Sequence, residues 1–129
     1  MVSVFLFKNM TRLSKQELHN LAMNIVGKKL ENLGFEFIAV NSKIYKHPQF
    51  VCVDKKNIRH FVLVKAVSYP EHPDVYDEIW MQTFVNHAEK HQAKVLYAGV
   101  GLANAKDFSK PLEKDTNFVV NFKEFLKLN

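Results

Sequence analysis

The sequence predicts an α/β domain in which a mixed sheet carries helices on both faces. Three observations lead to this fold class: a capped helical pattern from 14 to 33, two β-branched runs at 50–54 and 59–67, and a second helical pattern before an apolar strand at 94–100. A hairpin inside an otherwise alternating pattern of helices and strands requires antiparallel and parallel pairs in one sheet. The expected core order is therefore αβββαβ.

The first helix is expected to begin at Ser14, because Ser14 to Glu17 forms a capping box. In this arrangement the serine hydroxyl accepts from the backbone amide three residues on, and Glu17 reaches back to the amide of Ser14. Apolar residues then recur at helical spacing and predict one buried face: Leu18, Leu21, Ala22, Ile25, Val26, Leu30 and Leu33. Gly34 follows, where helices commonly end in a left-handed turn.

Strands are expected at 35–40, 50–54 and 59–67, each rich in aromatic and β-branched residues. The last two are nearly continuous in apolar residues, which is typical of strands covered on both faces. Two prolines within 69–74 require a loop there. The short break between 50–54 and 59–67 indicates a β-hairpin.

The second helix is predicted for 75–91, with Asp74 as its N-cap. Its inner face is expected to hold Ile79, Phe84, Val85 and Ala88. Gly99 and Gly101 mark the end of the strand at 94–100, where the backbone turns or approaches another segment closely. The remaining elements are expected as a helical turn at 103–108, a strand at 117–122 and a short terminal helix at 123–128.

Length and charge set the broad class of the protein. We expect the 129 residues to form a single domain, 1–129, in which 1–9 is an N-terminal extension or an added strand. The net charge of +5 permits an anionic partner such as nucleic acid without requiring one. No apolar run approaches the ~20 residues of a membrane span. The lone cysteine, Cys52, is expected in the core and favours a reducing, cytoplasmic location.

This element order, together with two residues at the hairpin, resembles the core of the restriction-endonuclease-like fold. In that family a Pro-Asp dipeptide begins the first hairpin strand, and an acid-x-Lys motif lies in the second. The resemblance covers about 14–100. It implies a divalent metal that two acids hold and that activates water against a phosphodiester, with the lysine helping to position the water.

Both acidic positions of that motif are replaced in this chain. Pro48 and Lys65 match the proline and the lysine, whereas Gln49 and Leu63 stand where the acids belong. Magnesium is typically held through one or two carboxylates, and neither an amide nor a hydrocarbon supplies one. The resemblance therefore implies a nuclease fold without catalytic residues, and we expect no metal and no cofactor.

The candidate binding residues are Lys65, Gln49 and Glu17. Leu63 and Lys65 lie two residues apart on a strand, so their side chains point to the same face. Lys65 is expected either to pair with a carboxylate, that of Glu17 or Glu36, or to contact an anion in the vacated cleft.

Other candidate sites carry weaker signals. His87 and His91 have the i, i+4 spacing of metal ligands, but no third ligand accompanies them, so we expect two solvated histidines near a helix end. Trp80 flanks the inner face of the second helix and is a candidate for a partner interface.

The whole chain, most clearly at 10–19 and at 97–105, resembles a small bacterial family whose members sometimes carry the label of the flavoprotein subunit of the sodium-translocating NADH:quinone reductase. That label implies a flavin and an iron–sulfur cluster. Because a [2Fe–2S] cluster takes four cysteine ligands and this chain has one cysteine, the residues disfavour that activity.

The sequence thus predicts a catalytically inactive binding or interaction module with a nuclease fold. Two alternatives stay open at this point. In the first, the basic surface binds nucleic acid without cutting it. In the second, the vacated cleft holds a small anionic ligand, or the module only dimerises or docks on a protein partner.

Overall fold

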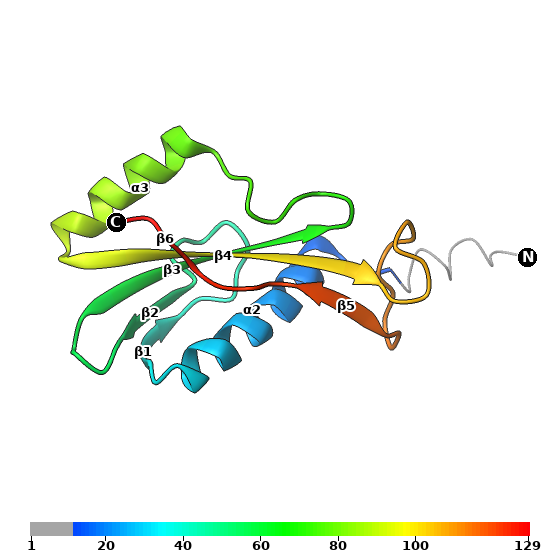
Figure 1. The fold of residues 1–129 in the computed structure, drawn as a ribbon, viewed down its shortest axis with the longest axis horizontal. Helices are drawn as coiled ribbons and strands as arrows, with labels where there is room; N and C mark the ends of the chain where they lie inside the picture. Colours follow the sequence, from blue (N-terminus) through cyan, green and yellow to red (C-terminus); the bar gives the residue numbers. More distant parts are fainter. Residues whose placement is uncertain (1–11) are drawn as a thin grey trace, which may run out of the picture.

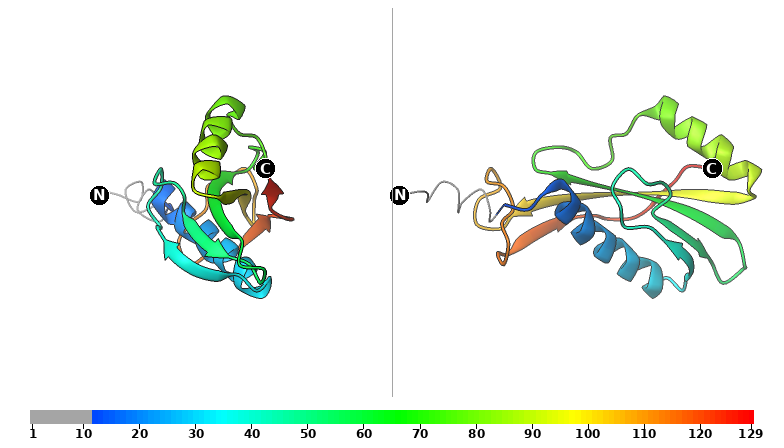
Figure 2. Two further views of the ribbon diagram at one scale, coloured as in Figure 1. Left: turned by 90° about the vertical axis from the view of Figure 1, so that its left-hand side faces the viewer. Right: turned by 180° about the vertical axis from the view of Figure 1, so that it is seen from behind.

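The computed structural model describes residues 12–129, and these form three layers with a six-stranded sheet between two helices (Figures 1 and 2). The elements along the chain are α2 (Lys15–Asn32), β1 (Glu36–Val40), β2 (Phe50–Val53), β3 (Arg59–Ser68), α3 (Glu78–Lys90), β4 (Ala93–Asn104), β5 (Phe118–Asn121) and β6 (Leu126–Lys127). The expectation for residues 1–9 lies outside the described residues.

The sheet is mixed, as predicted. Its strands lie in the order β1-β2-β3-β4-β5, and β6 pairs with another part of β4. The pair β3–β4 is parallel along the whole of β3, and the other pairs are antiparallel. The hairpin of β2 and β3 is therefore confirmed, with α3 as the connection between the two parallel strands.

The capping box of α2 is confirmed. The amide of Glu17 donates to Ser14 Oγ at 3.1 Å, and the amide of Ser14 donates to Glu17 Oε1 at 3.0 Å. The helix ends where predicted, because Gly34 takes a left-handed φ of 89°. Its buried face differs at the last turn, since Leu33 is 51% exposed.

Each face of the sheet has its own hydrophobic core. Side chains alternate along β3, so Val62 and Val64 pack under α2, whereas Phe61 and Leu63 pack under α3. Cys52 is fully buried in the α2 core, as expected, and burial raises the pKa of its thiol to about 12.

The start of α3 corrects the predicted boundary. Asp77, not Asp74, is the N-cap, and its Oδ1 accepts from the amide of Trp80 at 3.0 Å. Met81 then falls three residues before Phe84 on the buried face, while Ile79 is 84% exposed. The loop before α3 is longer than expected because Tyr97 Oη donates to its Pro73 carbonyl at 2.7 Å and fixes it on β4.

Two expectations for the C-terminal part were wrong. β4 does not end at 100 but runs to Asn104, because β5 pairs with its last four residues, and this removes the helical turn at 103–108. The helix expected at 123–128 is instead β6, which pairs with β4 at Leu96 and Tyr97. Phe125 packs in the α2 core and Leu126 in the α3 core, the alternation of a strand.

A close approach of two backbones explains Gly99. A Cβ placed there would lie 2.7 Å from the carbonyl carbon of Pro73, so a side chain has no room unless the loop moves. A Cβ at Gly27 of α2 would meet only the ring of Phe50 at 3.5 Å, an ordinary contact.

We therefore expect opposite effects from the same substitution at these two glycines. Gly99→Ala should lower the free energy of unfolding by about 1–3 kcal/mol, the usual cost of overpacking. Gly27→Ala should leave it unchanged or raise it by about 0.5–1 kcal/mol, because alanine is the better helix former. Urea unfolding followed by circular dichroism measures both, and equal destabilisation of the two variants would contradict the assigned close approach.

A candidate binding cleft beside the open edge of β3

The cleft exists because β2 covers only the first half of β3. The ladder between them joins Phe50–Val53 to Arg59–Val62. Gln49 extends it by one step, with its amide donating to the Val62 carbonyl at 3.0 Å and its Oε1 accepting from the Val64 amide at 2.9 Å. Pro48 precedes it and has no N–H to continue the ladder. Among residues 12–129, β3 beyond Val64 therefore has a neighbouring strand on one side only.

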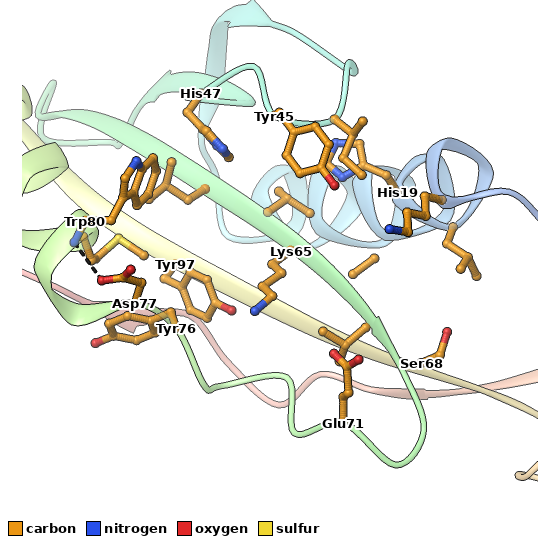
Figure 3. Close-up of a pocket in the computed structure, with 18 residues that line it drawn as sticks. His19, Tyr45, His47, Lys65, Ser68, Glu71, Tyr76, Asp77, Trp80 and Tyr97 are labelled. Atoms are coloured by element: carbon orange, nitrogen blue, oxygen red, sulfur yellow. Dashed lines mark hydrogen bonds between the residues drawn. The ribbon is translucent and has the colours of Figure 1, made fainter.

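The open half of β3 forms the floor of a cleft of about 760 Å³. In Figures 1 and 2 β3 extends past the ends of β1 and β2, and Figure 3 shows the side chains that surround it. The walls come from α2, from the connection between β1 and β2, and from the segment that leads into α3. Residues at these walls include Lys15, Leu18, His19, Ile44, Tyr45, His47, Glu71, Tyr76, Asp77 and Trp80.

Lys65 is the basic side chain of the floor. It is exposed, and its Nζ donates to the Val75 carbonyl at 3.2 Å. The salt bridge that the structure records within residues 12–129 joins Lys114 to Glu17 at 3.7 Å, so Lys65 has no carboxylate partner there. An ammonium group has three N–H donors, and two of those of Lys65 remain available to a ligand.

The other candidate binding residues lie elsewhere. Gln49 is fully buried and does not line the cleft; besides the bond to Val64, its Nε2 donates to the Lys46 carbonyl at 3.1 Å. Glu17 does not pair with Lys65, because it is held by Ser14 and Lys114, and Glu36 lies on β1. Of the three candidates, the structure brings only Lys65 to the cleft.

His19 is a cleft residue that the sequence analysis missed. It is 2% exposed, and its Nε2 is the buried side-chain nitrogen left without a hydrogen-bond partner in residues 12–129. Burial, with a smaller contribution from His47, lowers the pKa of His19. Its spacing of three and four residues from Ala22 and Met23 is the signal that places it on the buried stripe of α2.

Aromatic rings close one end of the cleft. The indole of Trp80 stacks on Phe84 with ring centroids 5.7 Å apart and meets the His47 ring edge-on at 5.0 Å. This contact joins α3 to the connection between β1 and β2. Trp80 is 42% exposed, and Tyr45, at 73%, stands over the cleft with a positive φ of 67°. The aromatic residues thus offer apolar contact area beside Lys65.

The donor set of the cleft does not suit a divalent metal. No group of three or more His, Cys, Asp or Glu side chains that could hold a metal ion occurs in residues 12–129. Asp77 lines the cleft but is used as the N-cap of α3. His87 and His91 contact each other, with ring centroids 4.7 Å apart, on the exposed end of α3. Within the same residues, no helix is both long and apolar enough to span a membrane.

Two histidines of the cleft, the buried His19 and the partly desolvated His47, predict how stability depends on pH. Burial lowers the pKa of both His19 and His47, so the unfolded chain takes up protons at a higher pH than the folded protein. The free energy of unfolding should therefore fall as the pH falls below about 6.5. His19→Gln should reduce this dependence between pH 7 and 5, and the exposed control His87→Gln should not. Equal pH dependence of all three proteins in urea unfolding would contradict the burial of His19.

Comparison with known proteins gives one match. A family model described as a domain of unknown function, DUF8840, matches residues 16–128. No curated protein and no solved structure matches the chain. The family match covers nearly all of α2, all of α3 and almost the entire sheet of the described residues, so the chain belongs to the DUF8840 family.

Proposed function

We propose that this protein is a binding module that has the core of the restriction-endonuclease-like fold without its hydrolytic chemistry. The observation that carries the proposal is that the residues matching the nuclease motif lie in different environments. Lys65 faces an open cleft, while Gln49 is buried in backbone hydrogen bonds and Leu63 is 2% exposed against α3. The two positions that hold acids in the nucleases serve the packing of the sheet here.

The connectivity supports the resemblance. The chain runs through α2, the antiparallel strands β1, β2 and β3, then α3, and then β4 parallel to β3. The helices lie on opposite faces of the sheet, and the lysine of the motif lies on the second hairpin strand next to the end of the first. This is the arrangement that the motif of that fold requires.

A catalytic metal does not fit the residues present. A nuclease metal needs hard oxygen ligands, usually carboxylates, beside the lysine. Of the two positions that match the acids of the motif, only Gln49 offers an oxygen, and its Oε1 already accepts from the Val64 amide. Asp54 is not a substitute, because its Oδ1 accepts from the amides of Lys56 and Ile58 in the hairpin turn. We therefore assign no hydrolytic step to this cleft.

The cleft chemistry favours a ligand with an anionic group and apolar surface. Lys65 supplies free N–H donors, and Tyr45, Tyr76 and Trp80 supply aromatic walls. Nucleic-acid binding, the main alternative, draws on the net charge of +5. The cleft itself is less basic, because Lys15 and Lys65 are balanced by Glu71 and Asp77.

The quinone reductase label is not part of this proposal. An iron–sulfur cluster takes four cysteine thiolates, and the one cysteine here, Cys52, lies buried with its pKa raised to about 12.

Incubation with nucleic acid tests the loss of hydrolysis. Supercoiled plasmid DNA and total RNA, each with Mg²⁺ or with Mn²⁺, should remain uncut by the full chain. The Lys65→Ala variant and the exposed control Lys94→Ala should likewise leave the DNA and RNA uncut. Metal-dependent cleavage that Lys65→Ala abolishes and Lys94→Ala retains would contradict the proposed function.

A further inference from the structure

We propose that the partner of the cleft is an extended peptide segment that adds a strand to the open edge of β3. The inference rests on the proposed function, since it requires that the cleft binds and does not cut. The class of partner follows from backbone groups of β3 that have no hydrogen-bond partner within residues 12–129.

The edge of β3 presents a regular row of unpaired hydrogen-bonding groups. Along β3, the even-numbered residues direct their backbone groups toward β2 and the odd-numbered residues toward β4, as the bonds of Val64 with Gln49 and of Tyr69 with Leu102 show. Past Gln49, this alternation directs four backbone groups into the cleft: the Val64 carbonyl, the amide and the carbonyl of Ala66, and the Ser68 amide. No residue within 12–129 hydrogen-bonds to them.

An unpaired row of this kind is costly to bury and is matched by another strand. Its acceptor, donor, acceptor, donor sequence repeats at every second residue, the spacing at which an extended peptide presents its own N–H and C=O groups. A nucleic acid has no such alternation along its backbone. The open edge from Val64 to Ser68 is roughly 13 Å long at ~3.3 Å per residue, so it takes a segment of about five residues.

The residues that line the cleft indicate which side chains the bound peptide should carry. In a strand added to this edge, successive side chains point to opposite faces of the sheet. One set points to the α2 side, where His19 has its unpartnered, buried Nε2 and Leu18 and Lys15 form the wall. The other set points to the side of Lys65, whose ammonium lacks a carboxylate within the described chain. We infer a partner peptide with an acidic residue that reaches Lys65.

Selection from random peptides tests this assignment and does not require the partner to be identified beforehand. Phage-displayed heptapeptides are selected on the immobilised full chain, and the enriched peptides are synthesised and titrated. Trp80 is the single tryptophan of the sequence and lies at the cleft, so its fluorescence reports binding directly. We expect enriched peptides with Asp or Glu at a fixed position. Lys65→Ala should weaken their binding about tenfold, and Lys94→Ala should not change it.

N-methylation of the peptide tests strand addition independently of how protein variants fold. Methyl groups placed one residue at a time remove single N–H donors and leave the side chains in place. At the positions whose N–H faces β3, we expect each methyl group to weaken binding about tenfold or more. At the positions between them, binding should change less than about threefold. A uniform response along the peptide would overturn strand addition.

Two further outcomes overturn the inference. If no peptide is enriched, and single-stranded DNA instead binds in a Lys65-dependent manner, the cleft belongs to nucleic acid. If a chain that starts at Met10 binds the peptides at least tenfold more tightly than the full chain, residues 1–9 compete for the edge and the partner is not a separate peptide. Neither result bears on the proposed loss of hydrolytic activity, because the cleavage assay tests that proposal separately.

Discussion

The hydrogen bond from the Val64 amide to the side chain of Gln49 fixes the point at which β2 stops covering β3. A backbone carbonyl normally accepts at this position in a ladder. Here the side-chain oxygen of a fully buried glutamine takes its place, and its Nε2 holds the incoming chain through the Lys46 carbonyl. The chain then turns away, so the second half of β3 faces a cleft. Loss of this side chain would leave a buried N–H unsatisfied, which costs about 1–3 kcal/mol.

The same interaction links the fold to the proposed function. A carboxylate at Gln49 would accept from Val64 but would have no N–H for Lys46. An acid at Leu63 would enter the core that Phe61, Phe84 and Val85 form under α3. The structure thus gives both positions a packing role that suits the residues present. What remains exposed in the cleft is Lys65, and the buried His19 of α2 and the open backbone edge of β3 lie beside it, a set suited to recognition.

The sequence predicted those parts of the fold that depend on local signals. The capping box of Ser14 and Glu17, the left-handed Gly34 and the hairpin around Asp54 are each encoded within a few residues. Elements that depend on distant partners were predicted less well. The segment at 123–128 has a composition compatible with a helix, but the free edge of β4 beyond β5 draws Leu126 and Lys127 into a strand.

The candidate site shows the same contrast between residues that local signals predict and features that depend on distant parts of the chain. Lys65 was found from the motif, and the spacing rule correctly placed it on the face of Leu63. The open edge was not predictable, because it depends on where a neighbouring strand ends in space. His19 and Trp80 became cleft residues only once α2 and α3 were placed on the sheet.

Amide hydrogen exchange of the free, full-length protein, followed residue by residue by NMR, tests the open edge of β3 most directly. The amides of Ala66 and Ser68 should exchange with solvent at least ~100-fold faster than those of Lys65 and Val67, which face β4, and Val64 should be protected by Gln49. Equal, strong protection of Ala66 and Ser68 would mean that another part of the chain already pairs with this edge, and it would contradict the account.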